Sequence, residues 1–121
     1  MNLKEILEKT KLKYKYVKKS IEYVEFENET IAVIIRSKSN VFKIKRNEFF
    51  LIDDMLLPYI FILIDVSKKE KYIYKVKEPN NDIRYAFESS KKDEIYFGKQ
   101  VLQNKKNDNE IIEEIKKIGS V

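Results

Sequence analysis

The chain contains no cysteine and no histidine. Without cysteine it cannot form disulfides, zinc–thiolate sites or a thiol nucleophile. Without histidine it lacks the usual general base near neutral pH, the commonest transition-metal ligand and any Ser-His-Asp triad. Any metal site would therefore need oxygen ligands, which suit Mg²⁺, Mn²⁺ or Ca²⁺.

Glycine and proline are also scarce, at two residues each, so a glycine-rich phosphate-binding loop is not expected. The 121 residues, 43% of them hydrophobic, fit one domain with a single core. The longest apolar stretch, residues 55–64, is far shorter than the ~20 residues of a membrane span. Residues 1–10 are amphipathic rather than a signal peptide, so we predict a cytoplasmic protein without membrane association.

Positive charge is concentrated near the start of the sequence. The formal net charge is +5, and residues 1–19, with seven lysines and two glutamates, carry the same +5. The basic segment consists of Lys11, Lys13, Tyr14, Lys15, Tyr16, Lys18 and Lys19. Lysines neutralise phosphates and tyrosines stack on bases, so this segment predicts binding to DNA or RNA. The alternative is the solvated face of a helix whose Tyr14 and Val17 belong to the core.

A second basic cluster consists of Arg36, Lys38, Lys43, Lys45 and Arg46. It surrounds the loop after an apolar run and offers a second contact surface for nucleic acid. The alternative is protection of a sheet edge, because lysines on an edge strand discourage pairing with other chains. Edge protection is the favoured interpretation for the lysines of residues 68–77, which alternate with Tyr72 and Tyr74.

The first predicted helix begins at Asn2, an N-cap with Glu5 at the third helical position. Apolar residues three and four positions apart extend it to about residue 20. A strand is the alternative where Leu12, Tyr14 and Tyr16 alternate with lysines. Two further helices are predicted, one from residue 47 to the proline at 58 and one from residue 107 or 108 to the glycine at 119.

Alternation and apolar runs predict the strands, at residues 23–27, 30–37, 41–45, 59–66 and 71–77, with weaker candidates at 83–88 and 94–97. The runs at 31–35 and 60–64 are apolar throughout, which indicates strands covered on both faces. We therefore expect a mixed α/β fold with a central mixed sheet of about five strands and helices on both faces. Asp53 and Asp54 are predicted at the surface, and Asp65 is predicted to form the turn after a central strand.

This order of elements over residues 31–76 resembles the restriction-endonuclease-like, or PD-(D/E)XK, nuclease fold. In that family a buried strand ends in an acid-any-Lys motif, and a helix, a second buried strand often introduced by a proline, and an outer strand follow. Here Ile34, Ile35, Arg36 and Ser37 occupy the positions of the acid, the spacer, the lysine and a frequent serine. The family's chemistry needs carboxylates around Mg²⁺ and a lysine near the attacking water. Ile34 is not an acid and Arg36 is not a lysine, so the motif is degenerate in this sequence.

Some relatives carry the acid on the following helix, and Glu48 occupies such a position. A relocated site would then comprise Glu25 or Glu27, Glu48 and Lys38, with Mg²⁺ as its cofactor. The leading hypothesis is instead a catalytically inactive nucleic-acid-binding protein without a cofactor. The alternatives are a protein-interaction or homodimerisation module of host-defence or viral type, and an Mg²⁺-dependent endonuclease with the relocated acid.

Overall fold

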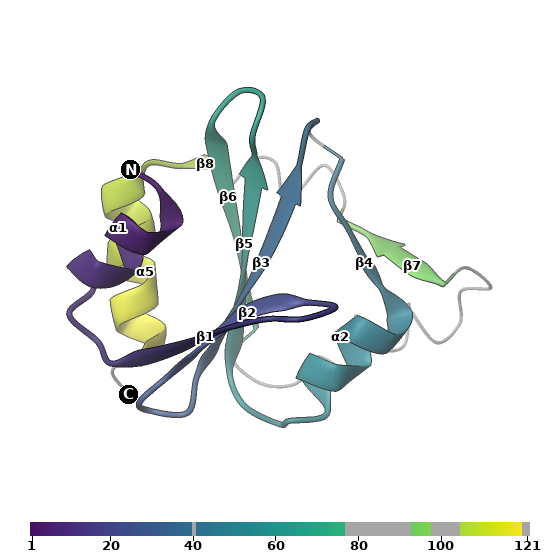
Figure 1. Ribbon diagram of the computed structural model, residues 1–121, viewed down its shortest axis with the longest axis horizontal. Helices are drawn as coiled ribbons and strands as arrows, with labels where there is room; N and C mark the ends of the chain where they lie inside the picture. Colours follow the sequence, from purple (N-terminus) through teal and green to yellow (C-terminus); the bar gives the residue numbers. More distant parts are fainter. Residues whose placement is uncertain (40, 77–92, 98–104, 120–121) are drawn as a thin grey trace.

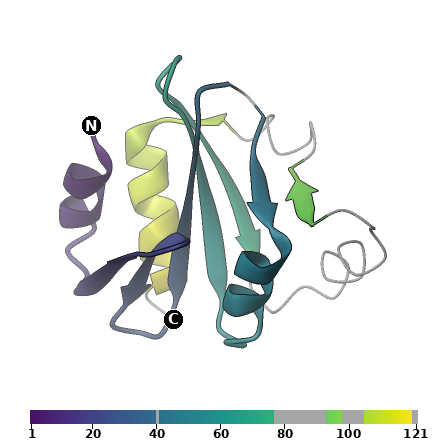
Figure 2. The same cartoon turned by 45° about the vertical axis from the view of Figure 1, so that its right-hand side comes forward.

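The computed structural model describes residues 1–39, 41–76, 93–97 and 105–119. The elements are α1 (Leu3–Lys9), β1 (Tyr14–Lys18), β2 (Glu22–Phe26), β3 (Ile31–Ser37), β4 (Lys43–Lys45), α2 (Arg46–Asp53), β5 (Tyr59–Asp65), β6 (Glu70–Val76), β7 (Glu94–Tyr96), β8 (Lys105–Lys106) and α5 (Asp108–Gly119). One sheet lies between α1 and α5 on one side and α2 on the other (Figures 1 and 2). The predicted mixed α/β class, with helices on both faces of a sheet, is confirmed.

Among the described residues, the main sheet has six strands in the order β1-β2-β3-β5-β6-β8. Its two central strands, β3 and β5, are parallel, and all other neighbours in the sheet are antiparallel. The segment between β3 and β5 contains α2, because a parallel pair needs a long crossover. About five strands were expected. Four of them are in this sheet, and the strand expected at 41–45 is β4, which pairs with β7 in a separate two-stranded sheet. The two additional strands of the main sheet are β1 and β8, which pairs with Lys71 and Tyr72 at the outer side of β6.

Side chains of the central strands alternate between two hydrophobic clusters, one on each face of the sheet. In β5, Ile62 belongs to the cluster covered by α1 and α5, whereas Phe61 and Leu63 belong to the cluster covered by α2. All seven residues of β5 are buried. This agrees with an uninterrupted apolar run, which indicates cover on both faces.

The predicted long first helix is wrong, because α1 ends at Lys9. The Thr10 hydroxyl donates to the Leu7 carbonyl at 2.6 Å and accepts from the Leu12 amide at 3.3 Å. Lys11 then has a φ of 59°, in the left-handed region, where an α-helix cannot continue. The strand alternative is correct, and most of the basic segment lies on or beside β1, an edge strand of the main sheet.

The second helix is shorter than predicted and ends at Asp53, before a left-handed residue at Leu56. Asp53 is buried, contrary to prediction, and accepts a hydrogen bond of 2.9 Å from the Tyr59 hydroxyl at the start of β5. Asp65 forms the predicted turn, since its Oδ1 accepts hydrogen bonds from Ser67 and Lys68. The strand candidate at 83–88 lies outside the described residues, and none of the helices in the described ranges has the length and hydrophobicity to span a bilayer.

Candidate nucleic-acid interface

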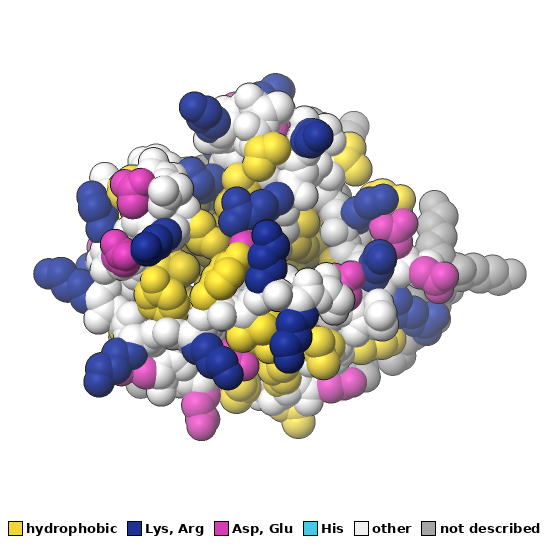
Figure 3. Space-filling model, viewed as in Figure 1, with side chains coloured by type: hydrophobic (Ala, Val, Ile, Leu, Met, Phe, Trp, Pro, Cys, Tyr) yellow, Lys and Arg dark blue, Asp and Glu magenta, His cyan; other side chains and the backbone are white. Residues whose placement is uncertain are grey.

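A groove of about 310 Å³ lies where the turn between β1 and β2 approaches β3, β4 and the start of α2. Its cations are Lys18, Lys19, Arg36, Lys43 and Lys45, and its carboxylates are Glu22, Glu48 and Glu94. We call this site the basic groove. It unites members of both basic clusters that the sequence predicts, although about 25 residues of chain separate Lys18 from Lys43. In Figure 3, Lys and Arg side chains gather over the centre of the molecule, in the region of β1, β2 and β3.

The sheet register explains why the end of β1 reaches β3. Lys18 pairs with Glu22, and Glu22 pairs in turn with Ile34. Arg36 lies two residues beyond Ile34 on the same face of the sheet. The Glu22 carboxylate receives two hydrogen bonds from Arg36, at 3.0 Å from Nε and 2.9 Å from Nη2, and one from the Tyr16 hydroxyl. Three neighbouring strands therefore contribute one side chain each to a single polar cluster.

The electrostatics of Glu22 follow from these contacts. Burial alone would raise the pKa of Glu22, but the hydrogen bonds from Arg36 and Tyr16 outweigh burial and lower it. The hydrogen bonds to Glu22 in turn raise the pKa of Arg36. Burial and then the contact with Glu22 raise the pKa of Tyr16. At neutral pH the cluster therefore holds a carboxylate, a guanidinium and a neutral phenol, in a fixed geometry.

The remaining charges leave the groove basic. Glu94 pairs with Lys43 at 3.2 Å, and Glu22 pairs with Arg36. Within the described part of the chain, Lys18, Lys19 and Lys45 form no salt bridge. Glu48 is the third carboxylate of the groove, so five cations and three carboxylates leave a formal charge of +2. A concave surface with an excess of cations concentrates positive potential and attracts polyanions.

A second hollow continues from the basic groove along β4. It shares Lys43, Lys45 and Glu94 with the groove and adds Arg46, whose guanidinium lies 5.7 Å from the centre of the Phe50 ring. Tyr96 of β7 is 51% exposed and lies directly opposite Lys43. Neither Tyr96 nor Glu22 was predicted from the sequence as a contact residue. The strand pattern at 94–97 was the only signal for Tyr96, and none marked Glu22.

Several predicted contact residues lie outside the basic groove. Lys11 and Lys13 precede β1, and Lys38 is exposed in the loop after β3. Lys15 is on β1 but faces the opposite side of the sheet from Lys18, because their positions differ by an odd number. Tyr14 is partly buried against the core, which agrees with that part of the alternative interpretation, but it lies on a strand and not on the predicted helix.

The four residues of the relocated nuclease site do not converge. Glu25 pairs with Ile31 at the start of β3, and Glu27 lies beyond the end of β2. The basic groove contains Glu48 but neither of these acids, which lie at the other end of β3 from Arg36. Among the described residues, no group of three or more carboxylates is positioned to hold a metal ion. Ile34, at the motif's acid position, is buried in the core.

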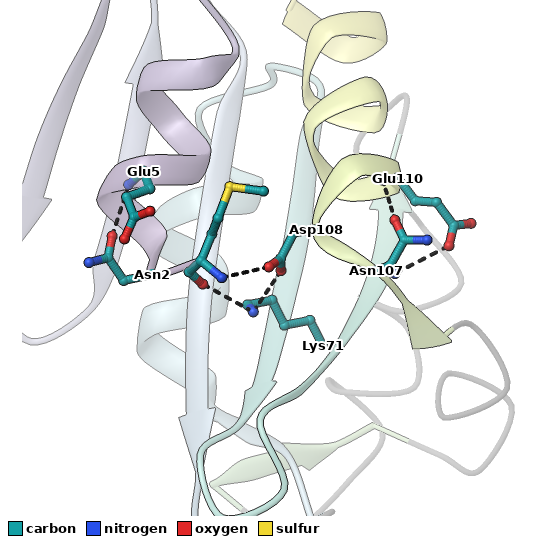
Figure 4. A network of polar contacts seen from close by, with 7 residues as sticks. Asn2, Glu5, Lys71, Asn107, Asp108 and Glu110 are labelled. Atoms are coloured by element: carbon teal, nitrogen blue, oxygen red, sulfur yellow. Dashed lines mark hydrogen bonds and ion pairs between the residues drawn. The ribbon is translucent and has the colours of Figure 1, made fainter.

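A third hollow, of about 790 Å³, lies at the end of the sheet where α5 begins. Here Lys71 donates to Asp108 at 2.8 Å, Lys105 to Glu70 at 3.0 Å, and Lys106 lies 3.8 Å from Glu110. We call these six residues the paired-lysine cluster; Arg36, Lys68 and Lys69 also line the hollow but are not part of this cluster. Figure 4 shows Lys71 beside Asp108, which also accepts from the N-terminal amine, and the reciprocal hydrogen bonds between Asn107 and Glu110 that cap α5.

Comparison with models of protein families, with curated proteins and with solved structures found no significant match. The function is therefore inferred from the side chains of the basic groove.

Proposed function

We propose that this protein binds nucleic acid in the cytoplasm through the basic groove, on a nuclease-like scaffold that does not cleave its ligand. The observation that carries the proposal is the convergence of five cations from the β1–β2 turn, β3 and β4, three of which form no salt bridge with described residues. These cations would neutralise phosphate groups of a bound strand, and the counterions of those phosphates would be released.

Two observations support a nuclease-like scaffold without catalytic activity: the order of elements and the residues at two positions of β3. The order of β3, α2, Pro58, β5 and β6 follows the order of elements in the family that the sequence resembles. The two motif positions are unsuited to metal-dependent hydrolysis, because Ile34 offers no ligand and Arg36 stays protonated and is bound to Glu22.

The main test compares two lysine pairs from the same basic segment. The double variant Lys18→Glu/Lys19→Glu reverses charges in the groove, and its matched control Lys13→Glu/Lys15→Glu reverses the same number of exposed charges outside it. Binding of a fluorescent oligonucleotide is measured by anisotropy between roughly 50 and 200 mM salt. We expect the groove variant to bind roughly tenfold more weakly, with the slope of log K against log salt smaller by about 1.5, as expected for two lost phosphate contacts.

The control should retain most of its affinity and its salt slope. If both variants lose affinity equally, net charge rather than the groove determines binding. If the unmodified protein binds no oligonucleotide at the lowest salt concentration, the proposed function is wrong.

Cleavage is tested separately, by incubating plasmid DNA with the protein and Mg²⁺ or Mn²⁺. We expect the plasmid to remain intact. Cleavage by the unmodified protein that disappears in Glu48→Ala would instead support the relocated nuclease site, since Glu48 is the one predicted acid that lines the groove.

One observation favours the alternative of a protein partner or a homodimer. β1 is an edge strand, and the amide of Glu27 donates to the carbonyl of Lys13, so the backbone groups of the even-numbered residues point away from β2. The backbone N–H and C=O groups of Tyr14, Tyr16 and Lys18 can therefore pair with a strand of another chain. Self-association that persists in high salt, measured by light scattering after gel filtration, would support this alternative.

A further inference from the structure

A pocket of about 460 Å³ lies between α1 and β1, next to the basic groove. Leu3 and Leu7 contribute from α1, and Tyr14 and Tyr16 contribute from β1. The two tyrosines share one face of β1, because they are two positions apart. In Figure 3, hydrophobic side chains are open to solvent in the area between α1 and β1, with Lys and Arg side chains beside them.

Arg36 connects this pocket with the basic groove, because its side chain lines both. Glu22 fixes the guanidinium through two hydrogen bonds and accepts a third from the Tyr16 hydroxyl. One carboxylate thus orients both the cation at the junction and an aromatic wall of the pocket. Such a site needs little rearrangement when a ligand binds.

The pocket and the groove together suit a ligand with a flat apolar part joined to an anionic chain. Lys4 is exposed at the rim of the pocket, so positive charge borders it on the α1 side as well as at Arg36. Nucleobases stack on tyrosine rings with little dependence on base identity. In a duplex the bases are already stacked and paired, so inserting one into the pocket would require unstacking it.

On the basis of the proposed function, we propose that the pocket between α1 and β1 binds an unpaired base of a single strand whose phosphates lie in the basic groove. The ligand class is therefore single-stranded DNA or RNA, or a strand end, rather than regular duplex. Arg36 contacts the phosphate next to the inserted base. Tyr16 provides the more exposed of the two aromatic walls, at 43% exposure.

The first experiment needs no variant of the protein. The affinity of the full chain is measured at low salt for a short single strand, for the same strand without its bases over the central positions, and for the duplex. Loss of the stacked base should weaken binding roughly five- to hundredfold. We therefore expect both the abasic strand and the duplex to bind more weakly than the intact single strand.

The second experiment changes the pocket. Tyr16→Ala should weaken binding of the single strand roughly tenfold but leave binding of the duplex unchanged. Tyr16→Phe keeps the ring and loses only the hydrogen bond to Glu22, so it should retain most of the single-strand affinity. Leu51→Ala is the control, because Leu51 is a large exposed apolar side chain, at 50%, that lines neither the pocket nor the basic groove. Thermal unfolding of each variant checks that it folds.

The outcomes separate this inference from the proposed function. If the full chain binds duplex, intact strand and abasic strand equally well, the base pocket is wrong although the basic groove still binds nucleic acid. The same conclusion follows if Tyr16→Ala weakens single-strand and duplex binding by the same factor. If no oligonucleotide binds, the proposed function itself fails and the base pocket fails with it.

Discussion

The basic groove and the paired-lysine cluster both contain several lysines, but they differ in the carboxylates around them. In the paired-lysine cluster, Lys71, Lys105 and Lys106 each have a carboxylate partner within 3.8 Å. In the basic groove, Lys18, Lys19 and Lys45 form no salt bridge with described residues. Glu22 and Glu94 are bound to Arg36 and Lys43, and Glu48 forms no salt bridge with a described residue. Both regions contain lysines and carboxylates, but they differ in how many of the lysines form salt bridges.

This difference indicates a division of roles between the two regions. Paired charges connect β6, β8 and α5 and contribute to folding, whereas unpaired cations on a concave surface are available to a polyanion. The number of lysines in the sequence does not distinguish these two roles. The positions of the carboxylates around the lysines distinguish them, and these positions depend on the fold.

The largest effect on stability should come from the paired-lysine cluster. Asp108→Ala removes the partner of Lys71, whose side chain is only 12% exposed, and of the N-terminal amine. We expect the free energy of unfolding in urea to fall by about 2 kcal/mol, since a partly buried cation loses its partner. Oligonucleotide binding should not change.

The groove variant Lys18→Glu/Lys19→Glu should show the reverse pattern, with stability lowered by no more than about 1 kcal/mol. Both lysines are exposed, and the main cost is the like charge that Lys18→Glu places opposite Glu22. The proposed division of roles would be refuted if Asp108→Ala left stability intact, or if it weakened binding as much as the groove variant does.

Acid should destabilise the protein partly through the paired-lysine cluster. Burial would raise the pKa of Asp108, but the hydrogen bonds from Lys71 and the N-terminal amine lower it. Hydrogen bonds from Tyr72 and Lys105 lower the pKa of Glu70. A carboxyl with a lowered folded-state pKa stabilises the protein above its unfolded pKa, and this contribution is lost as the pH falls through the folded value.

Unfolding in urea at a series of pH values should therefore show stability that is constant near neutrality and declines below about pH 4.5. The decline should be shallower in Asp108→Asn, which has no carboxyl to protonate at that position. An equally steep decline in this variant would assign the acid sensitivity to other carboxyls, such as Glu22 in the groove, whose pKa is also lowered.

The sequence was sufficient for the features that depend on local pattern. The apolar runs in β3 and β5 identified buried central strands, and a capping residue at 107 or 108 identified the start of α5. Helices on both faces followed from two strands that needed cover on both sides. These inferences succeed because burial and capping act on neighbouring residues.

The features that depend on register could not be predicted. Helical spacing and strand alternation coexist between residues 10 and 17, and contacts of Thr10 together with the left-handed Lys11 decide between them. Glu22 became the centre of the polar cluster only through its pairing with Ile34, and a shift of one residue would place it on the other face. The burial of Asp53 depends on the position of Tyr59, which no local pattern specifies.

The smallest predicted effect concerns Glu94, a carboxylate of the basic groove that pairs with Lys43. Lys43 and Glu94 form an exposed pair, with side chains 53% and 33% exposed, so Glu94→Gln should change stability by less than about 0.5 kcal/mol. Removing this negative charge leaves Lys43 available to phosphate, and we expect oligonucleotide affinity to rise roughly two- to threefold.

The matched control is Glu113→Gln, which removes the same charge from an exposed pair with Lys116 on α5. A rise in Glu94→Gln alone means that the balance of charges within the groove governs binding. An equal rise in both variants means that the net charge of the whole protein governs it, and the contrast between the groove and the paired-lysine cluster would then have no bearing on binding.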